Sequence, residues 1–108
     1  MTAPKLIPFD QEHIQLAQFA GALSHPARIS IVTLLQGKEH VSFKEIVNEI
    51  PLAQATVSQH VKVLLEAELL IQFPEGPRMS YALNCDKVKS FCQSFQCTLK
   101  NETPDEQS

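Results

Sequence analysis

The sequence predicts a mostly helical domain with a small β-hairpin, arranged as a winged helix-turn-helix in the order α-α-(β)-α-α-β-β-α. Two amphipathic segments flank a turn at Pro51, which is the pattern of a helix-turn-helix. Apolar and polar residues then alternate on both sides of residues 74–77, as in a hairpin, and a last helical pattern follows. We expect a flexible N-terminus over residues 1–9, this domain over residues 10–100 and an acidic disordered tail over residues 101–108.

The composition is that of one globular domain, and it excludes several classes of protein. With 108 residues, of which 44% are hydrophobic and 19% charged, the chain has room for one core. Every apolar run is far shorter than the roughly 20 residues of a membrane span. Three glycines are too few for a glycine-rich phosphate loop. Three cysteines, an odd number, argue against a secreted disulfide framework, so we expect a cytoplasmic protein with no membrane partner.

The net charge of −3 argues against a protein that coats nucleic acid without specificity. Three of the twelve acidic residues lie in residues 101–108, and the rest of the chain has nine acids and nine bases. A neutral body can still bind DNA if its bases lie on one face. The net charge therefore does not exclude a DNA-binding protein.

Residues 24–26, Ser-His-Pro, separate the first two predicted helices. Asp10 is a good N-cap for the first helix. We expect Ser24 to cap the second helix, with Pro26 in its first turn, where proline is tolerated. This helix ends just before Gly37, a residue suited to a helix C-terminus.

Two further helices surround Pro51. Ser42 and Glu45 form a capping box that opens the shorter one, after a one-residue strand at Val41. Pro51 ends this helix, and the next one spans about residues 53–68. Its core-facing stripe consists of Val57, Val61, Leu64, Leu65 and, at the same spacing, Glu68.

The alternation that follows predicts two strands with one buried face. That face would hold Ile71, Phe73, Met79, Tyr81 and Leu83. Prolines at positions 74 and 77 exclude a tight two-residue loop, so we expect a longer one. The last helix is capped by Asn84 or Asp86. Its apolar stripe consists of Val88, Phe91, Cys92, Phe95 and Leu99.

The outward face of the helix over residues 53–68 is small and polar, and residues 54–65 contain no acid. A helix fits the major groove of DNA, where its outward side chains meet base edges. Glutamine can pair bidentately with adenine, hydroxyls can bind base or phosphate, and lysine supplies a phosphate contact. An ordinary solvated helix face is the alternative. The expected DNA contacts on this helix are Gln54, Thr56, Ser58, Gln59 and Lys62.

Three segments resemble the ArsR/SmtB family of winged-helix repressors. Residues 22–29, Ala-Leu-Ser-His-Pro-Ala-Arg-Ile, are similar to its entry segment. Residues 55–64, Ala-Thr-Val-Ser-Gln-His-Val-Lys-Val-Leu, followed by Glu-Ala, are similar to its recognition helix. Residues 78–83, Arg-Met-Ser-Tyr-Ala-Leu, match the returning strand of its wing. The resemblance covers about residues 15–95 and implies a homodimer built on the first and last helices, a palindromic DNA operator and release by an inducer.

The resemblance adds residues to the expected site. It implies that His60 touches phosphate or base; a packed imidazole hydrogen-bonded to a backbone carbonyl is the alternative. Arg78 is the one base of the wing. Ala53 and Glu68 depart from the family pattern, which has a capping serine and a glycine there, and the missing cap costs about 1 kcal/mol. The implied dimer interface includes Leu16, Phe19, Phe91, Cys92 and Phe95.

Neither metal site of the family is present in the sequence. Residues 39–43 lack a cysteine pair, and Val88 stands where a histidine would follow Asp86. We therefore expect no metal and no cofactor, and the sequence does not identify an inducer. Among the thiols, Cys92 is expected to be buried on the apolar stripe and Cys97 to be more exposed. The thiols that could react with oxidants or a soft metal across the dimer are Cys85 and Cys97.

Two other functions compete with a DNA-binding repressor. The acidic balance and the weakly basic wing favour a winged-helix module for protein–protein contact. A cysteine-based redox or soft-metal sensor would be a variant of the repressor itself. An enzyme is not expected, because serine, histidine and aspartate occur in no nucleophile-elbow or metal-ligand spacing and the small helical fold leaves little room for a pocket. We accordingly assign no catalytic residue.

Overall fold

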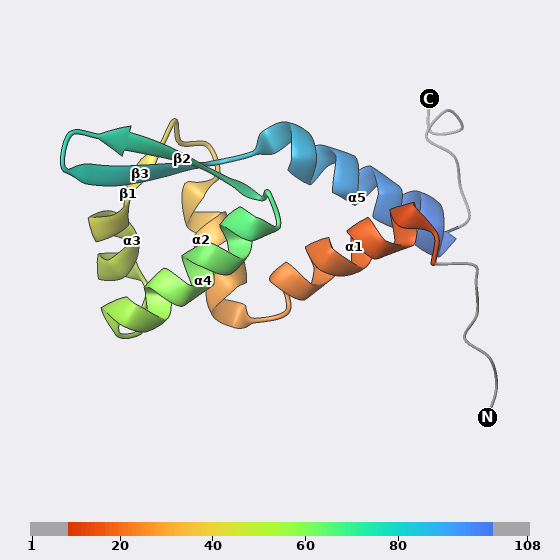
Figure 1. Cartoon of the computed structure of the whole chain (residues 1–108), viewed down its shortest axis with the longest axis horizontal. Helices are drawn as coiled ribbons and strands as arrows, with labels where there is room; N and C mark the ends of the chain where they lie inside the picture. Colours follow the sequence, from red (N-terminus) through yellow and green to blue (C-terminus); the bar gives the residue numbers. More distant parts are fainter. Residues whose placement is uncertain (1–8, 101–108) are drawn as a thin grey trace.

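The structure is a computed structural model that describes residues 9–100 (Figure 1). The predicted flexible N-terminus, apart from Phe9, and the predicted acidic tail lie outside the described residues. None of the helices in the described range is both long and apolar enough to cross a membrane. The elements, in the predicted order, are α1 (Gln11–Ala22), α2 (Pro26–Leu35), β1 (Val41–Ser42), α3 (Phe43–Glu49), α4 (Gln54–Glu66), β2 (Leu70–Glu75), β3 (Arg78–Leu83) and α5 (Cys85–Lys100).

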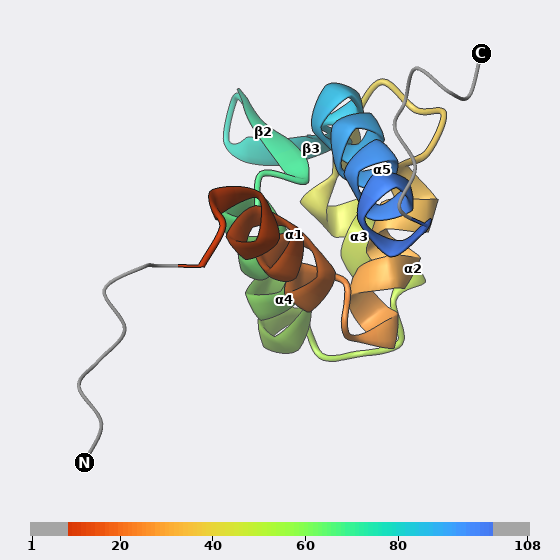
Figure 2. The ribbon, with the colours of Figure 1, turned by 90° about the vertical axis from the view of Figure 1, so that its right-hand side faces the viewer.

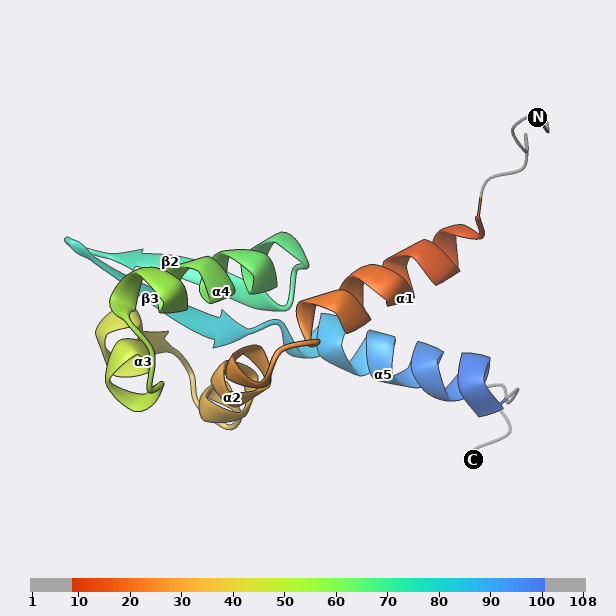
Figure 3. The same cartoon turned by 90° about the horizontal axis from the view of Figure 1, so that it is seen from below.

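The described residues form two regions. Helices α2, α3 and α4 pack with the sheet into what we call the body (Figure 1). Helices α1 and α5 lie against each other and run away from the body; we call them the helix pair (Figure 3). Figure 2 looks along the helix pair toward the body.

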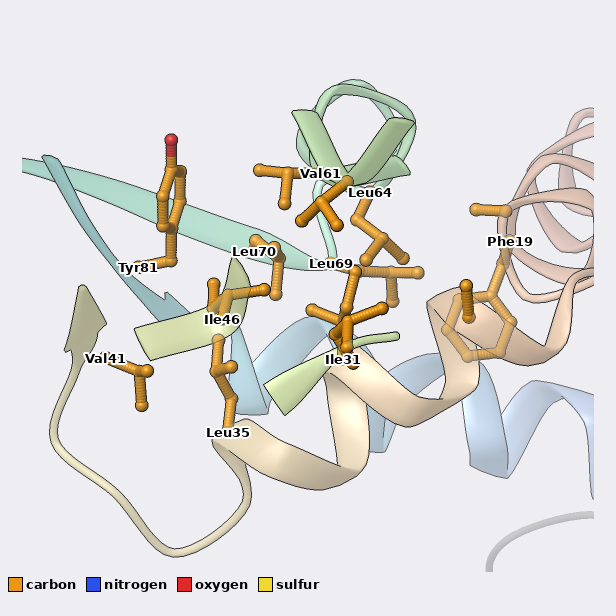
Figure 4. Packing of buried hydrophobic residues seen from close by; sticks show 14 residues of the cluster. Phe19, Ile31, Leu35, Val41, Ile46, Val61, Leu64, Leu69, Leu70 and Tyr81 are labelled. Carbon is orange, nitrogen blue, oxygen red and sulfur yellow. The ribbon is translucent and has the colours of Figure 1, made fainter. Parts of the chain in front are cut away.

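The body encloses the core (Figure 4). Ile31 of α2, Ile46 of α3 and Leu64 of α4 have no exposed surface. Burying an aliphatic side chain of this size stabilises the fold by roughly 1.5–3 kcal/mol. No residue of α5 is buried to the same degree, although Val88, Phe91 and Phe95 of this helix pack against the core.

Three of the four predicted helix caps are confirmed and one is wrong. At the start of α5, the Asn84 side-chain oxygen accepts a hydrogen bond from the Lys87 N–H over 3.5 Å, so Asn84 and not Asp86 is the cap. Asp10 accepts a hydrogen bond from the backbone N–H of Glu12, and the capping box of α3 is formed in both directions. The cap of α2 is His25, not Ser24, because the residue directly before a first-turn proline is the one held in the extended conformation. The His25 Nδ1 accepts from the N–H of Ala27 over 3.0 Å.

Helix α4 is shorter than predicted at its C-terminal end. It stops at Glu66, and Glu68 has φ +64°, so Glu68 cannot continue the stripe that was predicted for it. This turn is made without glycine, as the sequence requires. At the other end Ala53 occupies the N-cap position, and its side chain makes no capping hydrogen bond.

The predicted long loop of the hairpin is wrong. Glu75 pairs with Arg78, which leaves two residues in the turn. Gly76 has φ +61°, and proline supplies the negative φ that the second position of a type II′ turn needs. Pro74 lies inside β2, the edge strand of the order β1-β3-β2, where it removes no hydrogen bond from the centre of the sheet.

The tight turn also overturns the predicted buried face of the hairpin. Its register pairs Ile71 with Ala82 and Phe73 with Ser80, whereas Tyr81 pairs with Gln72. Directly paired residues share a face of the sheet. Ile71 and Phe73 therefore lie on the face opposite Tyr81 and are each 41% exposed, while Tyr81 is buried in the core.

Candidate nucleic-acid interface

Helix α4 separates its apolar and polar residues as predicted. Val57, Val61 and Leu64 are buried in the core. The five residues expected to contact DNA from this helix are all exposed: Gln54, Thr56, Ser58, Gln59 and Lys62. Helix α3 precedes α4 across the four-residue turn at 50–53, and the hairpin follows it, so the order is that of a helix-turn-helix with a wing.

An open groove of about 680 Å³ lies between α3, α4 and the wing. It brings together three residues that the sequence analysis assigned to DNA, Gln54 and Ser58 of α4 and Arg78 of the wing. Thr56, Gln59 and Lys62 are exposed on α4 but do not line it. The remaining lining residues are Ser42, Phe43, Lys44, Val47, Asn48, Pro77, Met79 and Tyr81.

Lys44 is a candidate that the sequence analysis missed. This exposed residue lines the groove on α3, and Arg78 lines it on the wing. Cations on opposite sides of a groove suit a phosphate backbone, which supplies much of the affinity of proteins for DNA. One signal in the sequence could have identified Lys44. It lies inside the capping box, between Phe43 and Glu45, and therefore in the first turn of α3.

Glu75, the acid at the tip of the wing, contacts two neighbouring side chains. The Ser80 hydroxyl donates a hydrogen bond to the Glu75 carboxylate. The His40 Nε2 lies 3.7 Å from the other oxygen of the same carboxylate. These contacts direct Glu75 toward β3 and β1. Arg78 takes part in neither ion pair found among the described residues.

His60 lies inside the protein, unlike its neighbours on α4. It is 8% exposed, and its Nδ1 accepts a hydrogen bond from the Arg28 guanidinium over 2.9 Å. Its ring lies 4.4 Å from the His25 ring. Burial, and then the neighbouring His25 and Arg28, lower the pKa of His60 below its ordinary value. Of the two interpretations offered for this residue, the geometry matches the packed imidazole, with a guanidinium in place of the carbonyl.

The residues expected at a dimer interface mostly hold the helix pair together within one chain. Leu16 and Phe19 are buried. The Phe19 ring stacks on Phe91 at 4.4 Å and lies 5.5 Å from Phe95. Cys92 is the exposed member of the predicted set. Large apolar side chains are exposed at the far end of the pair, with Phe9 at 83% and Leu99 at 78%.

The burial predicted for two of the thiols is reversed in this chain. Cys92 is exposed and Cys97 is partly buried, while Cys85 is exposed. The stripe prediction failed because the main packing partner of α5 is α1, and none of the residues of α5 is fully buried. Within residues 9–100 no cluster of three or more His, Cys, Asp or Glu side chains is placed to hold a metal ion.

Comparison with known proteins gives a domain and a fold. A family model described as a helix-turn-helix domain matches residues 23–72. An ArsR-like transcriptional regulator from Rhodococcus sp. RHA1 is similar at a TM-score of 0.72 with 19% identity, covering 82% of this chain and 83% of that one. HlyU from Vibrio cholerae N16961 has a TM-score of 0.70 and 20% identity, over 82% and 95% of the two chains. Rv0081 from M. tuberculosis has a TM-score of 0.66 and 25% identity, over 85% and 92%.

No curated protein sequence matches the chain. The structural matches nevertheless cover most of both chains, so they compare whole domains rather than one shared motif. They confirm the winged helix-turn-helix fold that the sequence predicts.

Proposed function

We propose that this chain, which has a helix-turn-helix domain and the fold of an ArsR-like regulator, represses transcription by binding a palindromic DNA operator as a homodimer. The proposed DNA contacts are Gln54, Thr56, Ser58, Gln59, Lys62 and Arg78 from the sequence analysis, together with Lys44. A signal of unidentified chemistry would release the operator. The cytoplasm, where such an operator is accessible, is the proposed location.

The observation that carries this proposal is the exposed face of α4 beside a groove with cations on both sides. Residues 54–65 contain no acid, so over this length no side chain on the α4 face repels phosphate, and the acid of this face, Glu66, lies at the end of the helix. Lys44 and Arg78 would contact the backbone, which sets the position of the protein on the duplex. Gln59 is free to meet base edges, which carry the sequence information.

Dimerisation is proposed from the helix pair. Helix α5 is covered on one side by α1, and none of its residues is fully buried. Leu99 is exposed on α5 and Phe9 is exposed just before α1, and a second copy of the chain would cover them. Two copies related by a two-fold axis would present two α4 helices to two half-sites, as a palindromic operator requires.

The experiment is selection from a random duplex pool with the purified protein at about 0.15 M salt, where non-specific electrostatic binding is weak. We expect the wild type to enrich one inverted repeat. Lys62→Glu places an acid on the α4 face and should abolish the enrichment. Lys38→Glu is the matched control, because Lys38 is equally exposed but lies in the loop after α2. A pool that stays random with a folded, dimeric protein would contradict the proposal.

A module for protein–protein contact is the second candidate. The exposed Ile71 and Phe73 on the outer face of the wing favour it, because apolar side chains that share one exposed face are typical of interaction surfaces. This candidate predicts no salt-dependent binding to any duplex. It also predicts that a protein partner is captured in pull-downs, and that Ile71→Ser and Phe73→Ser abolish this capture.

A thiol-sensing variant of the repressor is favoured by the exposure of Cys85 and Cys92. It predicts that an oxidant or a soft metal weakens operator binding. The effect should disappear when both cysteines are replaced by serine. An oxidant effect that survives the replacement would contradict this variant.

A further inference from the structure

A single arginine connects three elements of the molecule. The Nε of Arg28 donates to the carbonyl oxygen of Ala22 over 2.7 Å, and a terminal guanidinium nitrogen lies 3.5 Å from the carbonyl of Gly21. The other terminal nitrogen lies 2.9 Å from Nδ1 of His60. Arg28 itself belongs to the first turn of α2. One guanidinium therefore joins the end of α1, the start of α2 and the middle of α4.

The α1 end of this link has an electrostatic reason. Gly21 and Ala22 lie in the last turn of α1, which contains no basic residue of its own. Carbonyls of a last turn lack helical partners and form the negative end of the helix dipole. The Arg28 cation satisfies the carbonyl of Ala22 and lies near that of Gly21, which also accepts hydrogen bonds from Ser24, so it ties the end of α1 to the start of α2.

The α4 end of the link requires a neutral imidazole. Arginine always carries its charge and offers only donors, and neither ion pair among the described residues gives Arg28 a carboxylate partner. His60 must therefore accept through Nδ1 and keep its proton on Nε2. His25 and Arg28 are the groups whose charge acts on His60, and both disfavour its protonation. The His25 ring packs on His60 at 4.4 Å while its own Nδ1 caps α2.

We propose that Arg28 is a positioning residue for the DNA-reading helix: by binding His60, it fixes the orientation of α4 relative to the helix pair. This inference rests on the proposed function, since it takes α4 as the reading helix and the helix pair as the dimer contact. In a dimer, the angle between α4 and the helix pair sets the distance between the two reading faces. That distance has to match the half-site spacing of the operator. Arg28 thereby contributes to the choice of operator without touching DNA.

The side chains next to His60 are the reason that its position matters. Ser58, Gln59 and Lys62 are exposed on the same helix within two residues of it. A small rotation of α4 about its axis moves all three of them together. A bidentate base contact depends on geometry within a fraction of an ångström, so specific contacts should be lost before non-specific phosphate contacts.

The first test needs no DNA. In the wild type, the ¹⁵N shifts of His60 should show an unprotonated Nδ1 and a protonated Nε2, with a pKa below the usual histidine range. Arg28→Lys keeps the charge but cannot bridge acceptors on two helices. We expect it to abolish the fixed tautomer and to speed amide exchange in α4 about tenfold or more relative to α3. A protonated Nδ1 in the wild type, or an unchanged tautomer in Arg28→Lys, would overturn the link.

The second test uses the duplex that the wild type enriches from the random pool. We expect Arg28→Lys to lower affinity for it by about tenfold, similar to the loss of one base contact. Binding to an unrelated duplex of equal length should change less than about twofold, because phosphate contacts remain. Selection with Arg28→Lys should enrich repeats with a broader range of half-site spacings. His60→Gln, which restores a neutral acceptor, should retain most of the affinity.

Lys38→Ala is the matched control, an exposed cation of the loop after α2 that should leave all of these readouts unchanged. Equal losses of Arg28→Lys on both duplexes, with spacing unchanged, would reduce Arg28 to a general structural role and overturn the proposal. If the wild type enriches no sequence, the proposed function fails. The tautomer and exchange measurements then still decide whether Arg28 positions α4.

Discussion

The body and the helix pair bury their apolar residues in different ways. In the body, Ile31, Ile46 and Leu64 come from three helices and meet in one core without exposed surface. In the helix pair, α1 buries Leu16 and Phe19, but the last helix buries none of its residues fully. The body completes its core within one chain, whereas the pair leaves apolar surface of α5 exposed. Under the proposed function, the part that reads DNA folds within one chain, and the part that sets the assembly is completed by a second copy.

The largest expected effect is in the body. Leu64→Ala leaves a cavity at a site with no exposed surface, so it should lower the free energy of unfolding by about 2–5 kcal/mol. Leu99→Ala, at 78% exposure, is the contrasting change and should stay within about 0.5 kcal/mol for the monomer. Urea unfolding at low protein concentration, followed by circular dichroism, measures both. Similar losses for the two variants would remove the distinction between the regions.

The next effect tests the exposed surface of the helix pair. Leu99→Glu places a charge on the exposed end of α5 and should weaken dimerisation by about tenfold or more, because an unpaired charge would be desolvated in the interface. Sedimentation across a range of concentrations measures this. Thr98→Glu, a neighbouring exposed position with the same added charge, is the control. Equal association of Leu99→Glu and the wild type would place the interface elsewhere.

Acid should destabilise the body through His60. Its pKa is lower in the folded chain than in the unfolded one, so the unfolded state binds more protons as pH falls below about 6.5. The contribution of His60 to stability is complete above that pH and decreases until the lower folded pKa is reached. His60→Gln should flatten this part of the pH profile of the unfolding free energy. An identical slope in the two proteins would contradict the assignment.

The remaining effects are expected on the surface of α4, where two variants separate two kinds of contact. Lys62→Ala should weaken binding to all duplexes about equally and reduce the slope of log affinity against log salt by about one. Gln59→Ala should relax base preference at one position, at a cost of about 1–3 kcal/mol for the preferred duplex. Fluorescence anisotropy with matched and unrelated duplexes distinguishes them. Equal effects of both variants on every sequence would refute these roles.

Local patterns predicted most of the body correctly. The capping box at Ser42 and Glu45 and the stripe of α4 through Val57 and Val61 depend on neighbours in the sequence, and both are confirmed. The exposed polar face of α4 follows from the same periodicity.

The errors lie where a prediction needed a register or a neighbouring element. The two-residue turn depends on φ at Gly76, and this turn moved Ile71 and Phe73 to the outer face. The exposure of Cys92 depends on what covers α5. The bond between Arg28 and His60 joins residues 32 positions apart, which no local spacing can reveal. The place of Lys44 in the groove likewise depends on how α3 meets the wing.

Pro74 bears on how this protein remains in solution. In a hairpin with a two-residue turn, the pair beside the turn is hydrogen-bonded, and the next pair directs its backbone groups outward. Pro74 belongs to that next pair, with Met79, so the free edge of β2 lacks an N–H donor at this point. An edge strand that carries Ile71 and Phe73 would otherwise be a template for strand addition and aggregation. Proline in the wing thus acts as a gatekeeper that limits edge-to-edge association between copies of the chain.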